Sequence, residues 1–365
     1  MKYASISYSV GLCLLSATLV VEEQADAPSV VPAAISAPAS SADDCASAQG
    51  LARVVCLADA FKATLTPEQI ARVQLPYSKT DAVKWSNFPQ AFVRTPRVGL
   101  PLGSLNPAQL RAANVLMAAV LATNVPNEGY DELEGVRAAD DFVGKTTGKT
   151  DTFGGGNYLL AFLGTPSATG LWELQFGGHH YAFGNTYNGG KVAGVTPSFR
   201  GVEPMTPVAA NGRTYQPMDD ERRAFAGLLA GLSRPEQATA KLPTTFRDVL
   251  LGPGRDGQFP TAKQGVRVGA LSPAGQTLVL DAIKHYVNDL DPATAAPVLA
   301  RYAAELADTY VSYAGSGTMG QESDYVRIDG PGVWIEYSAQ PNRDVPGTAH
   351  AHSVWRDRRS DYGGN

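Results

Sequence analysis

The sequence has no run of basic residues and, after its N-terminal segment, no long apolar run. Lys and Arg are scattered along the chain, charged residues make up only 18% of its 365 residues, and the formal net charge is −5. A basic stripe is the electrostatic footprint of nucleic-acid-binding surfaces, so we expect no nucleic-acid partner. A membrane-spanning helix needs about 20 apolar residues, so we expect no membrane span in the mature chain. The 44% of hydrophobic residues is typical of a globular protein.

The motifs of several large enzyme classes are also missing. The chain has no G-x-S-x-G sequence, which would mark the nucleophile of an α/β hydrolase, and no H-E-x-x-H zinc motif. The glycine-rich residues 153–157 lack the Lys-Ser or Lys-Thr pair of a phosphate-binding loop. The aromatic residues in the segment 85–89 and Trp172 are candidates for pocket walls, although such side chains belong more often to the core.

The N-terminal segment has the pattern of a signal peptide. A basic second residue precedes the mostly apolar residues 9–21, and residues 25–27 place small side chains at the two positions that a signal peptidase reads. We therefore assign residues 1–27 to a signal peptide, with cleavage further on, near Ala33-Ala34, as the alternative, and expect a periplasmic or secreted protein. Residues 28–44, rich in Ala, Pro and Ser, predict a flexible leader, and residues 45–365 predict a single large globular domain.

Cysteine is scarce, and its distribution agrees with export. Cys13 would leave with the signal peptide, which leaves Cys45 and Cys56 in the mature chain. Two cysteines in an oxidising compartment predict one disulfide. On one continuous helix their Cα atoms would lie about 16 Å apart, whereas a disulfide tolerates less than about 7 Å. We therefore expect the chain to turn near residues 47–50.

Helix and strand signals come in blocks rather than in strict alternation. Helical periodicity is found at residues 51–65, 106–123, 219–232, 273–290 and 292–310, and strand signals at residues 157–164, 172–183, 191–197, 325–328, 333–337 and 348–355. Thr66-Pro67-Glu68-Gln69 and Asn106-Pro107-Ala108-Gln109 have the composition of capped helix starts. The pattern predicts an α+β fold with a mainly antiparallel sheet and helices in blocks in the N-terminal and C-terminal thirds.

Histidine is rare, and four of the five histidines fall in two tight groups. His179 and His180 follow two glycines, and His350 and His352 are separated by one alanine. On a strand His350 and His352 point to the same face, a spacing that suits two ligands of one metal ion. His179 and His180 face opposite sides of an extended chain, unless a bulge at the preceding glycines turns both inward.

Together the four histidines predict a site for one transition-metal ion, with His285 read as a structural or surface residue. Zinc is the first expectation, and copper or iron stays open because imidazole binds all three. A third histidine ligand from the first pair would leave an open position, as in catalytic zinc sites. Glu336 is a candidate fourth ligand or general base. Arg356 and Asp357 are candidates for orienting a ligand or for holding an anionic substrate.

A set of short motifs extends over nearly the whole mature chain. They are residues 60–69, 85–89, 97–100, 162–167, 177–180, 196–199 and 335–337, then Gln340 and finally residues 350–357, of which the last run is the most specific. In order and spacing these motifs resemble the family catalogued as domain of unknown function number 3500. The resemblance implies a known sequence pattern but supplies no reaction. The chain departs from the family at residues 185–188, where the family is usually more apolar.

Three functions therefore stay open on the sequence alone. The first is an exported metal-dependent enzyme with a small-molecule substrate, using hydrolytic zinc chemistry or copper or iron redox chemistry. The alternative is a non-catalytic metal- or small-molecule-binding protein, and the third is a protein whose histidines only form hydrogen bonds. The metal hypotheses require a ring nitrogen of His350 or His352 to lie within about 5 Å of one from His179 or His180.

Overall fold

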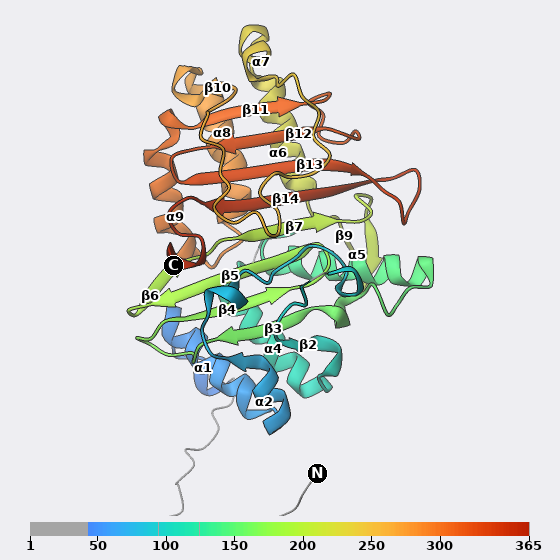
Figure 1. Ribbon diagram of the computed structural model, residues 1–365, viewed down its shortest axis with the longest axis vertical. Coiled ribbons are helices and arrows are strands. Elements are labelled where there is room, and N and C mark those ends of the chain that lie inside the picture. The colour runs from blue at the N-terminus through green and yellow to red at the C-terminus, as the bar shows by residue number, and fades with distance from the viewer. Residues whose placement is uncertain (1–42, 94, 124, 365) are drawn as a thin grey trace, which may run out of the picture. The chain divides into compact units, whose positions relative to one another are not determined.

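A single twelve-stranded sheet runs through the computed structural model, which describes residues 43–93, 95–123 and 125–364. Across the sheet the strands are β1 (Gln74–Leu75), β3 (Leu159–Leu163), β4 (Trp172–Gly177), β5 (Tyr181–Asn188), β7 (Ser198–Val202), β14 (Ala349–Asp357), β13 (Val333–Pro341), β12 (Tyr325–Asp329), β11 (Tyr310–Ala314) and β10 (Val266–Arg267) (Figure 1). Two more strands, β2 (Leu100–Pro101) and β6 (Lys191–Gly194), pair with β3 and β5. Only the β1–β3 pair is parallel among these described strands. A separate hairpin joins β8 (Val208–Ala210) to β9 (Arg213–Tyr215).

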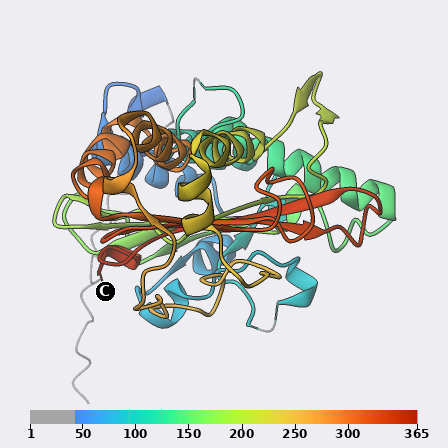
Figure 2. The same cartoon turned by 90° about the horizontal axis from the view of Figure 1, so that it is seen from above.

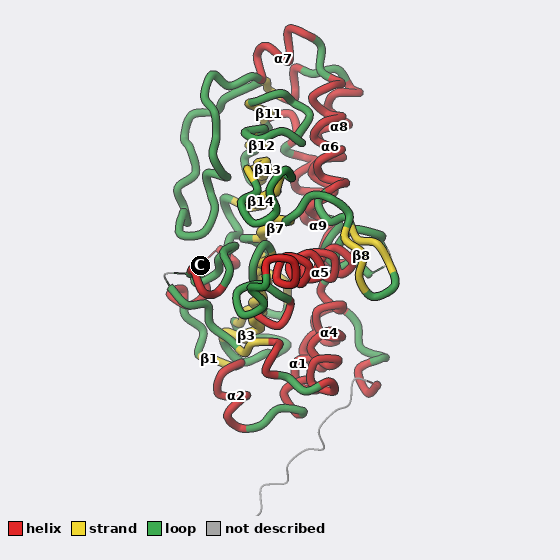
Figure 3. The backbone as a smooth tube through the Cα atoms, turned by 90° about the vertical axis from the view of Figure 1, so that its right-hand side faces the viewer, coloured by secondary structure: helices red, strands yellow, loops and turns green. Residues whose placement is uncertain are grey.

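The two faces of the sheet are covered differently. The long helices lie on one face, and mostly irregular segments cover the other, as Figures 2 and 3 show. The helices of the first face are α1 (Gly50–Ala63), α4 (Pro107–Val120), α5 (Tyr130–Thr147), α6 (Asp219–Gly231), α8 (Pro273–Val287) and α9 (Pro292–Ala304). The shorter helices are α2 (Pro67–Val73), α3 (Lys79–Ala82) and α7 (Arg234–Ala240). We call these faces the helix face and the loop face.

The predicted α+β class with a mainly antiparallel sheet is confirmed. Both predicted helix starts carry reciprocal capping boxes, with the side chains of Thr66 and Asn106 accepting from the backbone of the third helical residue. Two strands of the sheet had no clear signal in the sequence. These are β7, which contains a buried arginine and a glycine, and β11, which begins in a segment with helical periodicity.

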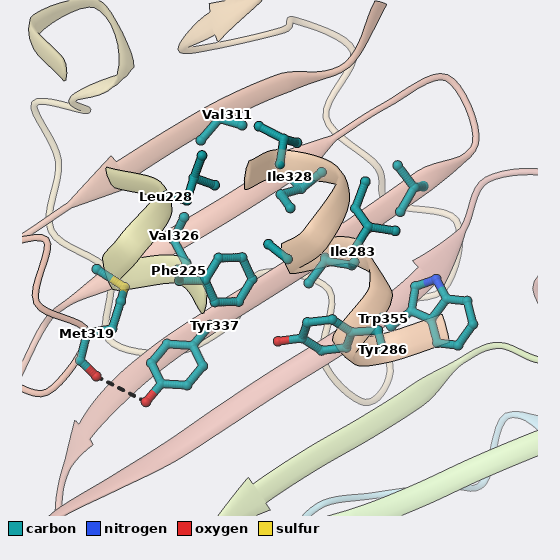
Figure 4. Close-up of a cluster of buried hydrophobic side chains, with 14 of the residues drawn as sticks. Phe225, Leu228, Ile283, Tyr286, Val311, Met319, Val326, Ile328, Tyr337 and Trp355 are labelled. Carbon is teal, nitrogen blue, oxygen red and sulfur yellow. Dashed lines mark hydrogen bonds between the residues drawn. The ribbon is translucent and has the colours of Figure 1, made fainter. Parts of the chain in front are cut away.

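Apolar side chains on the helix face form the larger part of the core. Around α6 and α8, Phe225, Leu228, Ile283 and Tyr286 pack against side chains of the C-terminal strands (Figure 4). A second cluster lies beneath α1 and α4. The loop face holds a smaller cluster, made by Ala82, Trp85, Ala161, Leu163, Ala182, Phe199, Val354 and Tyr362. The loop face therefore has less apolar packing and more room for polar groups.

The signal peptide at residues 1–27 and nearly all of the leader at 28–44 lie outside the described residues, so these boundaries stay predictions. None of the helices in the described part of the chain is both long and apolar enough to cross a membrane.

Cys45 and Cys56 form a disulfide, as predicted. Their Cα atoms lie 5.7 Å apart. A short 3-10 turn ends at Cys45 and α1 begins at Gly50, so the chain turns between them as the spacing required. The bond ties the start of the described chain to α1.

Removing this disulfide should lower stability without changing the rest of the fold. The two cysteines are 11 residues apart, and closing a loop of that length reduces the entropy of the unfolded chain by an amount worth about 3 kcal/mol. We expect the Cys45→Ala/Cys56→Ala double variant to lose about 2–3 kcal/mol of unfolding free energy in urea titrations. An unchanged free energy of unfolding would show that the bond does not constrain the chain.

Candidate metal centre

Three histidine rings from the two sequence groups point their Nε2 atoms at one another on the loop face. The Nε2 atom of His352 lies 3.2 Å from that of His180 and 3.1 Å from that of His350. One ring nitrogen of each residue lies within 4.8 Å of the other two. The convergence that the metal hypotheses require is therefore present, although more than 150 residues separate the two groups in sequence.

Pairing between strands brings the two groups together. His350 and His352 lie on β14 and point to the same face, as their spacing predicted. In β7, which pairs with β14, Gly201 lies directly opposite His352. A Cβ atom at Gly201 would come within 3.1 Å of the His180 ring and within 2.7 Å of the Ala351 carbonyl oxygen. Glycine at this position therefore leaves the space that the His180 ring occupies.

His179 and His180 form the turn between β4 and β5. His180 has a φ of 65°, a left-handed conformation uncommon for a residue with a side chain. This conformation, rather than a bulge at the glycines, turns the two rings to one side, where they stack with centroids 3.6 Å apart. Tyr158 donates to the His179 carbonyl, and the backbone N–H of His180 donates to the carbonyl of Asn87 at 3.1 Å. The surroundings therefore hold the strained turn in place.

The Nδ1 atoms of His350 and His352, which face away from the three converging Nε2 atoms, each contact a hydrogen-bond acceptor. Nδ1 of His352 lies 2.9 Å from Oδ1 of Asp248, and Nδ1 of His350 lies 3.2 Å from the carbonyl oxygen of Pro341. A carbonyl or an ionised carboxylate only accepts hydrogen bonds, so each Nδ1 carries the ring proton. The Nε2 atoms of His350 and His352 therefore both present lone pairs, and they do so 3.1 Å apart.

Burial keeps the His350 and His180 rings neutral. It lowers the pKa of His350 to about 3, with neighbouring His352 and His179 adding to the effect. Burial also holds the pKa of His180 well below its usual value, again helped by the adjacent histidines. Burial opposes ionisation of Asp248, but its contacts with His352, with the Val249 N–H and with His350 together lower the pKa of the carboxyl. Neutral rings beside an ionised carboxylate are the protonation states that metal binding needs.

A second group of side chains adjoins the first and shares His180 with it. A ring nitrogen of His179, one of His180 and a carboxylate oxygen of Glu203 lie within 4.8 Å of one another. Nδ1 of His179 lies 2.6 Å from Oδ1 of Asp140, a buried residue of α5. Burial raises the pKa of Glu203. The arrangement places an Asp–His pair and a carboxyl group beside the three converging nitrogens.

Both groups open into one pocket with a volume of about 440 Å³. Its walls combine the histidines and their acidic neighbours with aromatic and polar side chains, namely Asn87, Phe88, Pro89, Phe92, Phe153, Gln340, Pro341, Arg343 and Asp344. Phe88 and Phe92 are largely exposed at its edge. Residues 87–89, considered above as pocket walls, do line it, whereas Trp85 and Trp172 are core residues.

Glu336 does not line the pocket, and its carboxylate is fully engaged elsewhere. It accepts hydrogen bonds from the backbone N–H groups of Leu250 and Leu251 at 2.7 and 2.9 Å. It also accepts from the Tyr325 hydroxyl and the Trp334 indole at 2.6 and 2.8 Å. Burial raises the pKa of Glu336, and these four donors oppose that effect. The carboxylate anchors the loop that presents Asp248 to His352, rather than reaching the histidines itself.

The structure also places Arg356 and Asp357 away from the pocket. The guanidinium of Arg356 donates to the Leu251 carbonyl at 3.1 Å and pairs with Asp256 and Asp361, each at 2.7 Å. Asp357, next along β14, pairs with Arg301 at 2.6 Å. Of the sequence-derived candidates, the four histidines converge, whereas Glu336, Arg356 and Asp357 hold segments around them.

Sequence comparison places the chain among known sequences. Residues 47–364 match the family described as protein of unknown function (DUF3500). The chain belongs to this family. The resemblance seen in the sequence motifs is thereby confirmed. No curated protein and no solved structure matches the chain. The description of DUF3500 names no reaction, so the geometry of the site is the basis for a function.

Several site residues of this DUF3500 member had no role assigned from the sequence, namely Asp140, Glu203 and Asp248. Asp140 had a usable signal: it lies on the buried side of α5 among Val136, Ala139 and Val143. An acid within an apolar helical stripe needs a buried partner. Glu203 and Asp248 lie outside helices and strands, where no periodicity marks a side chain as buried.

The Glu336→Gln variant tests the anchoring role. A glutamine amide would turn its NH₂ group toward one or two of the four donors, so we expect a loss of roughly 2 kcal/mol of unfolding free energy. Glu305→Gln is the control, because Glu305 also accepts a backbone N–H but is partly exposed to solvent. Normal stability together with complete loss of metal binding would instead make Glu336 a ligand.

Proposed function

We propose that this protein is an exported metal-dependent enzyme that binds one transition-metal ion through Nε2 of His180, His350 and His352. The substrate is a small molecule that enters the 440 Å³ pocket. The disulfide and the signal-peptide pattern of residues 1–27 support export. Zinc is the first candidate for the ion, with copper or iron as the alternatives, because imidazole ligands suit all three.

One observation carries the proposal: the Nε2 atoms of His350 and His352 face each other across 3.1 Å. Each ring is held in this tautomer by its acceptor on the far side, Pro341 or Asp248. Two neutral rings so arranged repel, and burial disfavours a proton between them. A metal ion removes the repulsion by accepting both lone pairs.

The distances also fit a common ion. Two nitrogens each about 2.05 Å from one ion, at angles between 90° and 109°, lie about 2.9–3.3 Å apart. The observed separations of 3.1 and 3.2 Å fall in this range. The Asp248 contact to Nδ1 of His352 reproduces the carboxylate–histidine–metal arrangement that orients ligands in many metal sites.

Three histidine ligands would leave a coordination position for water, and we propose that His179 takes a proton from it. An ion of this kind lowers the pKa of a bound water to about 7. Asp140 holds Nδ1 of His179, which leaves Nε2 of that ring for proton transfer, and Glu203 lies beside it. In the hydrolytic version, the ion would supply an activated water as the nucleophile, and His179 would hold the proton of that water and return it to the leaving group.

The pocket walls indicate the kind of molecule that fits. Phe88, Phe92 and Phe153 provide apolar faces, and Arg343 provides a positive charge near the opening. A ring-containing molecule with an anionic group combines both features.

Replacing Asp248 should weaken metal binding without removing a ligand. Loss of such a partner typically reduces metal affinity about 10–100-fold. We expect Asp248→Asn to weaken zinc binding by that factor in competition titrations, and His350→Gln or His352→Gln to weaken it further. Asp256→Asn is the matched control, because Asp256 lies on the same loop but pairs with Arg356. Equal zinc affinity in all of these variants would refute the site.

A cobalt-substituted protein separates an enzyme from a carrier. If three histidines bind the ion and one position is open, azide should change the visible cobalt spectrum, and His179→Gln should leave cobalt content unchanged. Loss of cobalt in His179→Gln, together with a spectrum that does not respond to azide, would show a closed four-histidine site. The protein would then be a non-catalytic metal-binding protein.

A further inference from the structure

Three carboxylates that take no part in the histidine site converge on the helix face of the sheet. Glu128 lies in the turn before α5, Glu221 in the first turn of α6, and Asp289 just after α8. One oxygen of each lies within 4.8 Å of the other two. All three side chains are buried, with Glu128 the most exposed at 5%. Segments far apart in the sequence thus bring three acids together inside the protein.

The cations near this group do not balance its charge. Glu132 adds a fourth buried carboxylate, and it pairs with Arg200 of β7 at 2.8 Å. The same guanidinium also contacts Asp289. Nδ1 of His285 lies 2.5 Å from Glu128, but burial lowers the pKa of this ring. If all four were ionised, the carboxylates would exceed the single guanidinium by three negative charges, and burial together with this repulsion raises the pKa of Glu128, Glu132 and Glu221.

Buried polar atoms that face this group also lack partners. Apart from carboxyl contacts within the group, between Glu221 and Glu132 and between Glu128 and Asp289, the oxygens of fully buried Glu221 and Oε2 of Glu128 have no hydrogen-bond partner among the described residues. The hydroxyl of Tyr181, 1% exposed, has no hydrogen-bond partner either. It lies within electrostatic range of Asp289, Glu132 and Glu221. Buried groups of this kind are normally satisfied, so each points to a missing ligand.

We propose that Glu128, Glu221 and Asp289 bind a calcium ion. Carboxylate oxygens are hard ligands, and calcium binds them at about 2.3–2.6 Å, so two ligand oxygens lie at most about 5 Å apart. The smaller magnesium ion would bring them within about 4.2 Å. The three oxygens lie within 4.8 Å of one another, inside the span that the flexible coordination of calcium accepts. The ion would reduce the excess charge from three to one and give the Glu221 oxygens a partner.

One of the three acids lies at the edge of a surface pocket. A pocket of about 390 Å³ is lined by Glu128 and His285, together with Val125, Asp281, Lys284 and Asn288. Of the three proposed ligands, Glu128 is the one that lines this pocket, so the group comes closest to the solvent there.

The consequence would be mechanical support for the histidine site on the opposite face. Calcium would join the ends of α5, α6 and α8 above Arg200. The next residue of β7 is Gly201, which makes room for the His180 ring and pairs with His352. The calcium and histidine sites would thus lie on opposite faces of the same strand.

Calcium titration of the chelator-treated full chain tests the proposal. We expect one calcium ion per chain by calorimetry, with a Kd between about 1 µM and 1 mM, and a rise in Tm of about 5 °C at saturation. Glu221→Gln should weaken calcium binding at least about tenfold. Asp220→Asn is the matched control, because it removes a neighbouring carboxylate that pairs with Arg223 at the surface. Both Asp220→Asn and His350→Gln should bind calcium normally.

The competing account is that the carboxylates share protons and bind no metal. In that case the wild-type protein would not respond to calcium, and Glu221→Gln, which replaces a buried acid by a neutral amide, would raise Tm in its absence. That result would overturn the proposal. If Glu221→Gln does not fold, Glu128→Gln at the pocket edge serves instead, and unchanged calcium affinity there would equally count against the site.

Discussion

The pairing of β14 with β7 is the contact on which the rest of the structure depends. It joins a hairpin region in the middle of the chain to strands from its C-terminal end, and it places His352 opposite Gly201. Because glycine adds no side chain there, the His180 ring reaches the two rings on β14. On the other face of β7, Arg200 enters the buried acidic group. One strand pair therefore fixes the positions of both proposed sites.

Two buried charged side chains near the histidines, Glu336 and Arg356, do not line the pocket but hold the loop that carries Asp248. Glu336 and Arg356 both bind the backbone at Leu251, from neighbouring positions on the loop face. Their loop carries Asp248, whose carboxylate sets the tautomer of His352. Asp140 does the same for His179 from the helix face. These carboxylates thus act on the site by determining which nitrogen of each histidine ring carries the proton.

The sequence predicted those features that depend on a local residue pattern, such as hydrophobic periodicity or the composition of a helix start. Capped helix starts, strand blocks, the disulfide and the common face of His350 and His352 all follow from local spacing. The β7–β14 pairing could not be predicted from local spacing. Strand β7 has a buried arginine and a glycine at positions where a recognisable strand would have apolar residues. The prediction that Glu336 lies at the metal was wrong. The sequence alone cannot distinguish a strand carboxylate that binds an ion from one that accepts hydrogen bonds, and Glu336 accepts four.

The central claim is that an ion lies between three Nε2 atoms, and X-ray absorption at the zinc edge tests it directly. In the zinc-loaded full chain the account predicts three nitrogen neighbours at about 2.0–2.1 Å and one oxygen neighbour, with the outer-shell scattering of imidazole rings. A shell made only of oxygen atoms, or one that contains a single histidine, would place the ion elsewhere and contradict the account.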